Sequence, residues 1–402
     1  MVQDYGRYGG PMDQGRLPVP GEDTMKLARL FSSAVALAAS AAGVAAGAGP
    51  AVAAQATTSK PAVAGACRHV SGPFHRSQNK IIGAGGHRYV PYGIVVTGLG
   101  NPNWKTRHAG DDAEIAAAAA SWCANTVRLQ IFQYALLGPG KSGVTVNKTF
   151  LGLIEGEVTT ALNAGLDVVI NDQTEGGNPK AVGMPTAQTK AFWKVMSGRY
   201  AKNPDVIFDL YNEPRRANLR TEARTWKFWL RGGNYHGSYF VGLQPLARYI
   251  RGLGAKNLFW VEGPHTAGTL DQVLSHQITR AGPLEYAINH PGGVNVRHDS
   301  SDWYARFGFA AGKVPMTDAE WTNYASTRSC WANAPKSVPA FLRYLALKGM
   351  GLTAWTLTPG VLAASADLAD PTVIRSDWAC TNSGLDEGAG NAIMKWFEQH
   401  NS

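Results

Sequence analysis

The sequence is poor in charged residues and in cysteine, and it lacks the motifs of several common protein classes. Only 17% of its 402 residues are charged, and four are cysteines. No G-x-G-x-x-G segment follows the first β-rich run, which argues against a dinucleotide-binding protein. Lysines and arginines are scattered, so a nucleic-acid partner is not expected. The net charge of +9 indicates either general solubility or an affinity for anionic polymers.

No apolar run after about residue 56 is long enough to cross a membrane, but the N-terminus contains a shorter one. Residues 1–24 are polar and form an upstream extension. Residues 25–56 then combine basic Lys26 and Arg29, an apolar run, and a small-residue stretch ending near Ala56. This order predicts a secretory signal peptide, because the run is too short and too rich in alanine and glycine for a membrane anchor. We therefore expect a secreted, extracellular protein, monomeric, with its domain in residues 57–402.

The four cysteines predict disulfide bonds, because an even number in an exported chain is typical of them. Three pairings are open. We favour Cys67–Cys123 and Cys330–Cys380, since each joins segments that should be neighbours in the fold predicted below. Zinc is the alternative, but the chain has no C-x-x-C and no close histidine pair.

Short β-rich runs alternate with helix-length stretches along the rest of the chain. The strands are expected at Arg88–Val96, Asn125–Ile131, Leu166–Asn171, Val206–Tyr211, Asn257–Val261, Leu284–Asn289, Val314–Thr317 and Gly351–Leu357. Helices are expected at Asp111–Ala124 (with Asp111 as N-cap), Thr149–Ala164, Thr186–Ala201, Pro245–Leu253 and Ser337–Lys348. The strands are continuously apolar, as in a parallel sheet buried on both faces.

Eight strand–helix repeats predict the α/β class and a closed (β/α)8 TIM barrel forming a single catalytic domain. A short N-terminal hairpin at His75–Gly86 should cover the bottom of the barrel. Long loops are expected at Arg215–Gly237 and His290–Gly312.

Two glutamates follow predicted strands where barrel enzymes carry their working residues. Glu213 follows the fourth strand and Glu320 follows the seventh. Glycoside cleavage needs one carboxylic acid to protonate the departing oxygen and a second carboxylate facing the anomeric carbon. The pair therefore points to a glycosidase.

The segment Asn212-Glu213-Pro214 resembles the signature of glycoside hydrolase family 5, a clan of retaining, cellulase-like barrel enzymes. The resemblance covers about Tyr89 to Leu357. It implies that Glu213 is the acid/base and that Asn212 binds the sugar 2-hydroxyl. Glu320, in Glu320-Trp321, matches the nucleophile of that family.

Three further positions carry the resemblance. Arg128 in the second strand would keep the nucleophile ionised, Trp355 in the eighth would stack on the sugar, and His290 matches the strand-six histidine. Trp104, Trp303 and Trp321 are candidates for further sugar contacts. For each of these residues ordinary packing or ion pairing is the alternative, and for His290 a plain loop position is almost as well supported.

The chain departs from the family pattern at two places. The histidine after strand three is absent, so Asn171, Asp172 or Gln173 must fill its space. Pro291-Gly292 follows His290 where a His-x-Tyr is usual, which leaves Tyr304 or Tyr324 as substitutes.

Two other carboxylates compete with Glu320 for the nucleophile role. Asp318 lies two residues earlier, so strand alternation would point it the same way, whereas Glu262 after strand five is expected to shape the cleft.

The sequence thus predicts a retaining hydrolase of β-glycosidic bonds that takes a carbohydrate substrate and needs no metal or organic cofactor. A carbohydrate-binding pseudoenzyme and a transglycosylase remain alternatives. The glycan itself stays open.

Overall fold

The computed structural model describes residues 67–138, 145–173, 183–215, 219–289, 299–326, 329–331, 334–357, 362–363 and 389–402. The predicted polar extension 1–24, the predicted signal peptide 25–56 and His290 lie outside these residues.

Eight parallel strands close into a barrel whose neighbours follow one another in chain order, and β15 pairs with β4 to complete it. The strands are β4 (Tyr92–Val96), β5 (Thr126–Phe132), β6 (Asp167–Gln173), β7 (Val206–Asp209), β10 (Phe259–Glu262), β11 (Leu284–Asn289), β12 (Met316–Trp321) and β15 (Leu352–Trp355). Each lies in or overlaps one of the eight predicted runs. The predicted (β/α)8 barrel is confirmed.

The continuous apolar runs are explained by burial on both faces of the strands. Along β6, Val168 and Ile170 pack outward in the main core, whereas Val169 belongs to a second cluster inside the barrel. Side chains from neighbouring strands, such as Ile207 and Trp260, fill the interior beside Val169. The barrel is therefore a packed core rather than a pore.

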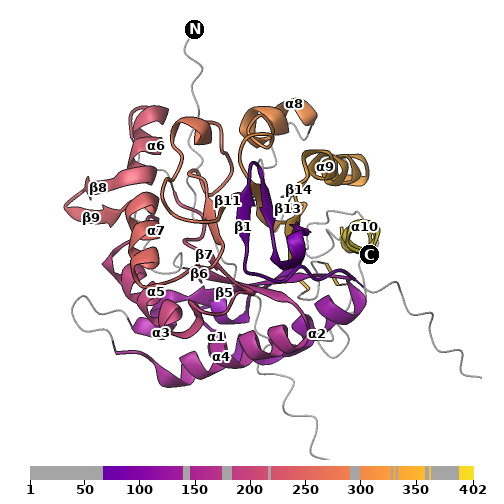
Figure 1. Ribbon diagram of the computed structural model, residues 1–402, viewed down its shortest axis with the longest axis horizontal. Helices are drawn as coiled ribbons and strands as arrows, with labels where there is room; N and C mark the ends of the chain where they lie inside the picture. The colour runs from indigo at the N-terminus through magenta and orange to yellow at the C-terminus, as the bar shows by residue number, and fades with distance from the viewer. Residues whose placement is uncertain are drawn as a thin grey trace, which may run out of the picture. The chain divides into compact units, whose positions relative to one another are not determined.

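Helices surround the strands (Figure 1). All five predicted helices are present, with ends shifted by a few residues. The helices are α1 (Trp104–Arg107), α2 (Asp111–Ser121), α3 (Gln133–Leu137), α4 (Lys148–Asn163), α5 (Ala187–Tyr200), α6 (Glu222–Arg231), α7 (Leu243–Gly252), α8 (Ser300–Trp303), α9 (Ala334–Lys348) and α10 (Gly390–Asn401). Side chains cap some of them: Asn147 accepts from the Phe150 N–H before α4, and Thr186 accepts from the Gln188 N–H before α5.

The predicted N-cap of α2 is wrong. Asp111 is the first helical residue rather than the cap, and its carboxylate is buried against the backbone of Gly98. The cap position belongs to Gly110, which has no side chain to accept a hydrogen bond.

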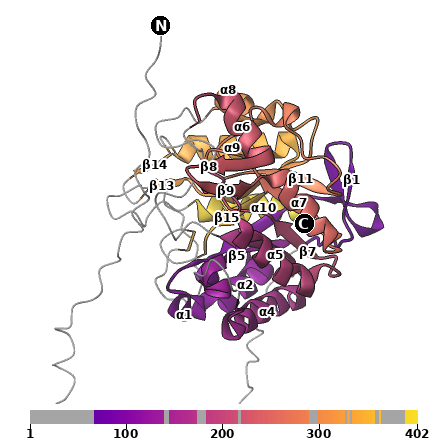
Figure 2. The ribbon, with the colours of Figure 1, turned by 90° about the vertical axis from the view of Figure 1, so that its left-hand side faces the viewer.

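Three other boundaries differ from the prediction. The run Arg88–Val96 is divided at Pro91 into β3 (Arg88–Tyr89) and β4, because proline has no N–H for a ladder. The expected loop Arg215–Gly237 contains α6 and the start of the hairpin formed by β8 (Gly232–Tyr235) and β9 (Ser238–Val241) (Figure 2). In α6, Thr221 is the N-cap and Trp226 and Trp229 are buried, which explains why this stretch is helical.

The expected loop His290–Gly312 is also partly helical. It contains α8 and a π-helical turn at Tyr304–Gly308. Asp299 caps α8 by accepting from the N–H groups of Ser301 and Asp302.

A small antiparallel sheet closes the bottom of the barrel. It consists of β1 (His75–Ser77), β2 (Lys80–Ile82) and β3, and in Figure 1 its indigo hairpin lies near the centre of the ring of helices. Ile81 and Tyr89 pack on the interior cluster, and the Tyr89 hydroxyl lies 2.9 Å from Oγ1 of Thr126. The predicted N-terminal hairpin is thus part of a three-stranded sheet.

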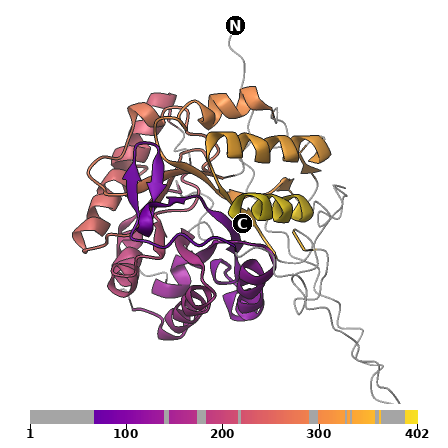
Figure 3. The ribbon, with the colours of Figure 1, turned by 45° about the vertical axis from the view of Figure 1, so that its right-hand side comes forward.

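The first and last described segments are joined at this same end. A disulfide links Cys67 to Cys123, as predicted, and the Arg68 N–H donates to the carbonyl of Asn401 at 2.6 Å. Figure 3 shows the yellow α10 beside the indigo N-terminal segment. The Cys330–Cys380 pairing stays a prediction, because Cys380 lies outside the described residues. Among the described helices, none has the length and apolar character that a membrane span requires.

Candidate active site

Arg128 lies at the centre of a hydrogen-bonded network at the C-terminal end of the barrel. Its guanidinium donates to Asp209 Oδ2 (2.9 Å), Glu320 Oε2 (2.8 Å), Asn212 Oδ1 (2.8 Å) and Glu262 Oε1 (2.7 Å). The side chain is fully buried. A single planar cation therefore fixes side chains from β7, β10 and β12 and from the segment after β7, which suits the fork geometry of arginine.

The network holds more acidic groups than cations. Burial alone would lower the pKa of Arg128, but Asp209, Glu262 and Glu320 outweigh it and raise that pKa. Burial raises the pKa of Glu262 well above its usual range, and the neighbouring charge of Asp209 adds to the effect. The pKa of Asp209 is also raised by burial, although Arg128 opposes it. The titrations of Glu262 and Asp209 are therefore coupled, and both pKa values are raised.

Glu262 also supports the backbone at Glu213. Its Oε2 accepts from the Glu213 N–H at 2.5 Å and from Asn289 Nδ2 at 3.2 Å. Both of its oxygens are occupied, and it is fully buried. The prediction that Glu262 shapes the cleft stays a prediction.

Glu213 has a backbone conformation that is rare for its residue type, with φ at +46°. Such a residue costs about 1–2 kcal/mol relative to ordinary conformations. The bond to Glu262 holds it there on one side, and on the other the carbonyl of Pro214 accepts from the Thr266 N–H at 3.0 Å. Strain of this kind is concentrated at functional sites.

A bulge in β12 separates Glu320 from Asp318. Ile288 pairs with Asp318 but Asn289 pairs with Glu320, so one extra residue lies between them on β12. Asp318 therefore points outward, as its strand partner Ile288 does. Glu320 points into the barrel and accepts from Arg128. The expectation that both point the same way is wrong, because the bulge breaks the alternation of the strand.

Two tryptophans proposed as sugar contacts are core residues instead. Trp321 is fully buried and stacks on Phe341 of α9, with ring centroids 5.8 Å apart. Trp303 packs edge-on against the same ring at 5.1 Å. The substrate-binding role predicted for Trp321 is wrong because the bulge turns its side chain outward to α9, and Trp303 also faces that helix. Trp355 is partly exposed at the end of β15, and Trp104 is partly buried against Phe150.

Asn171 is one of the three residues expected in place of the strand-three histidine, and it contacts the network. Its Nδ2 donates to Asp209 Oδ2 at 3.0 Å, so it faces the network, and Gln173 follows two residues later on the same strand. Asp172 alternates to the outer face and is fully buried, where burial raises its pKa well above the usual range. Of the proposed tyrosine substitutes, Tyr304 is exposed beside Lys348, and nothing is described of the Tyr324 side chain.

Three members of the network were not predicted from the sequence. Gln130 donates to Glu320 Oε2 at 2.7 Å, Asp209 accepts from Arg128, and Asn289 donates to Glu262. Gln130 could have been found from the spacing, since it lies two residues after Arg128 on one strand and shares its face.

The chain matches the family model described as cellulase, glycosyl hydrolase family 5, over residues 92–327. It is 28% identical over 174 residues to the manganese dependent endoglucanase Eg5A of Phanerodontia chrysosporium, which is 42% of this chain and 39% of that protein. The match thus spans about two fifths of that relative.

Solved structures agree on the fold. A β-glucanase of Saccharophagus degradans, SdGluc5_26A in complex with cellotetraose, superposes with a TM-score of 0.58 at 19% identity, covering 84% of this chain and 96% of the other. The catalytic domain of Thermobifida fusca endoglucanase Cel5A gives 0.59 at 14% identity, covering 82% and 98%. On the family match and this shared barrel, the chain belongs to glycoside hydrolase family 5 and is a cellulase-like glycosidase.

Proposed function

We propose that the protein is a secreted endo-acting β-glucanase that hydrolyses its substrate with retention of anomeric configuration. Glu320 is the nucleophile and Glu213 is the acid/base. In the first step a Glu320 oxygen bonds to the anomeric carbon, the glycosidic C–O bond breaks, and Glu213 gives its proton to the departing oxygen. In the second, Glu213 takes a proton from water, whose oxygen displaces Glu320.

The contact between Arg128 and Glu320 carries this proposal. A nucleophilic carboxylate must be ionised, and a guanidinium 2.8 Å away favours its charged form. The same guanidinium holds Asn212, whose neighbour along the chain is Glu213. The mechanism needs carboxyl groups about 5–5.5 Å apart, and a network centred on one arginine suits such an approach.

The choice of β-glucan as substrate is supported by the relatives. Their names describe two endoglucanases and a β-glucanase, and one of the structures holds cellotetraose. Secretion rests on the signal-peptide pattern of residues 25–56. The reaction needs neither metal nor organic cofactor, because the two carboxyl groups supply both the nucleophile and the proton.

The proposal is tested with Glu213→Ala and Glu320→Ala on barley β-glucan and carboxymethylcellulose, with Glu155→Ala as a matched surface control. Both site variants should fall at least a thousandfold in turnover while the control keeps wild-type activity. Near-wild-type turnover in either site variant would remove the role given to that residue. A wild-type protein that binds these glucans without releasing sugars would instead be a binding protein.

A further inference from the structure

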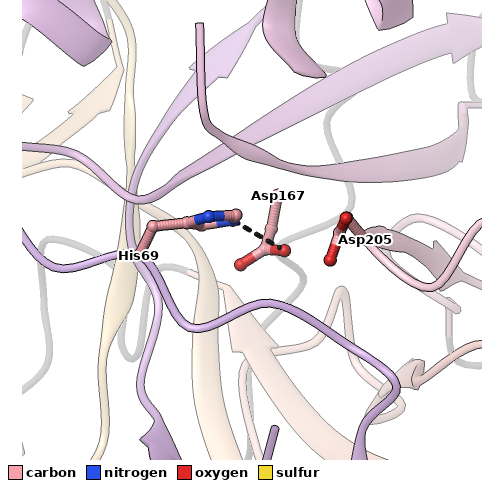
Figure 4. Close-up of side chains that lie close together, drawn as sticks. All are labelled: His69, Asp167 and Asp205. Carbon is pink, nitrogen blue, oxygen red and sulfur yellow. Dashed lines mark ion pairs between the residues drawn. The ribbon is translucent and has the colours of Figure 1, made fainter. Parts of the chain in front are cut away.

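Three side chains able to bind a metal converge at the end of the barrel opposite the active site. His69 comes from the segment before β1, Asp167 is the first residue of β6, and Asp205 directly precedes β7. Their ligand atoms all lie within 4.8 Å of one another (Figure 4). Asn171, which donates to Asp209 in the Arg128 network, follows Asp167 by four residues on β6, so the cluster is about 13 Å from that contact along the strand.

Asp167 is fully buried, and its one close ionisable partner among the described residues is His69. The side chain has no exposed surface, and among the described residues neither of its oxygens accepts a hydrogen bond. The nearest cationic group is His69 Nε2, 3.4 Å from Oδ1. Buried carboxylates are normally paired or bound to a metal, and Oδ2 of Asp167 has no hydrogen-bond partner among the described residues, so this oxygen is available to a cation.

The other two side chains are oriented by bonds on their far sides. Oδ1 of Asp205 accepts from the Gly72 N–H at 2.8 Å, and Nδ1 of His69 lies 3.4 Å from the hydroxyl of Ser71. In Figure 4 the imidazole and the Asp205 carboxylate lie on either side of the Asp167 carboxylate. Nε2 of His69 faces Asp167, and a second partner on the other ring nitrogen is a common feature of metal-binding histidines.

We propose that His69, Asp167 and Asp205 bind one divalent transition-metal ion, which fastens the N-terminal segment to the bottom of the barrel. One imidazole and two carboxylates suit zinc or manganese, whereas calcium prefers six to eight oxygens. The 3.4 Å between Nε2 and Oδ1 is close to the edge of a tetrahedron with metal–ligand bonds of about 2.0–2.1 Å. Water completes the coordination. The ion's charge balances the two carboxylates.

The ion acts on stability rather than on the reaction. It ties residues just after Cys67 to the starts of β6 and β7, next to the disulfide and to α10. A ligand bound only by the folded state raises its stability by mass action. Turnover at moderate temperature should not depend on it.

The experiment uses untagged protein stripped with EDTA and then dialysed. Zn²⁺ and Mn²⁺ are titrated by calorimetry at pH 7.5, with Ca²⁺ for comparison, and Tm is measured with and without each ion. We expect one equivalent of Zn²⁺ or Mn²⁺ and a rise in Tm of roughly 5 °C at a hundredfold excess over Kd. Ca²⁺ should bind at least tenfold more weakly.

Two variants locate the ion. His69→Gln and Asp205→Asn should each weaken binding at least tenfold and remove the Tm increment, whereas His75→Gln, a change at an exposed histidine, should keep both. Stripped wild-type protein that takes up no stoichiometric Zn²⁺ or Mn²⁺ would overturn the proposal. So would binding that survives in both site variants, because the ion would then lie elsewhere.

Discussion

Arg128 donates to Glu320 Oε2 at 2.8 Å, and that oxygen is thereby joined to the only cation in the described part of the network. The same arginine contacts Asp209 and Glu262. Its role is therefore structural as well as chemical: it balances the carboxylates that surround the proposed reaction centre.

Replacing Arg128 by methionine should destabilise the fold severely. The change leaves three carboxylates buried without their cation, and breaking a buried pair in this way costs about 3–5 kcal/mol. Urea unfolding at pH 7 measures the loss. Arg199→Met is the control, since Arg199 pairs with Glu155 at the exposed surface and should cost less than about 1 kcal/mol. Equal losses in the two variants would contradict the central position of Arg128.

Glu262 should act as a positioning residue. Glu262→Gln keeps a carbonyl oxygen for Arg128 or the Glu213 N–H and should retain most activity, whereas Glu262→Ala removes both contacts. We expect kcat to fall by about a hundredfold in the alanine variant, with KM changed less than threefold, because misplacement of a catalytic group acts on the chemical step. Rescue by glutamine separates this role from nucleophilic attack, which glutamine could not perform.

Glu285 should make stability fall as pH rises. Burial raises its pKa to about 8, whereas an unfolded glutamate titrates near ~4.3. The folded state binds the proton more tightly, so its stabilisation is complete below ~pH 4 and is lost as pH rises through 8. Glu285→Gln should therefore raise the free energy of unfolding by about 2–4 kcal/mol at pH 8 and change it little at pH 4.

The measurement is urea unfolding of both proteins at pH 4, 6 and 8. Glu155→Gln, at an exposed position, should track the wild type within about 1 kcal/mol throughout. A Glu285→Gln difference that does not grow with pH would count against the buried proton.

Most of the barrel could be predicted from the sequence, because each strand is buried on both faces and is therefore a continuous run of apolar residues. The α6 helix was not predicted, since its tryptophans lie among polar residues and a short hairpin strand rather than a barrel strand follows it. The break at Pro91 could be predicted, because proline has no N–H to donate to a strand ladder. The pairing of β3 with β2 depends on the tertiary fold and could not.

At the site, the sequence singled out residues that lie together, but it did not show the effects of strand geometry. Arg128 contacts both Glu320 and Asn212, and the roles given to these residues stay predictions. The bulge between Asp318 and Trp321 has no local sequence signal, so Trp321 was assigned to the wrong face. Glu262 could be seen in the sequence, but its contact with the Glu213 backbone depends on β7 and β10 being neighbours in space.

Removing the disulfide should cost stability without changing the reaction. Cys67 and Cys123 are 56 residues apart, and in the chain-entropy model a loop of that size is worth about 4 kcal/mol. Cys67→Ser should lower Tm by roughly 10 °C, with kcat on β-glucan unchanged at 30 °C. A loss of turnover in the folded variant would show that the N-terminal segment also affects the mouth of the barrel.

The account depends above all on Glu320 attacking the anomeric carbon. The most direct measurement is to incubate the protein with a 2-deoxy-2-fluoro-β-cellobioside that has a good leaving group, then digest it and locate the attached sugar by mass spectrometry. The account predicts one glycosyl ester, on Glu320, formed as activity is lost. An ester on Asp318 or Glu262, or turnover that releases the inverted anomer with no ester at all, would contradict it.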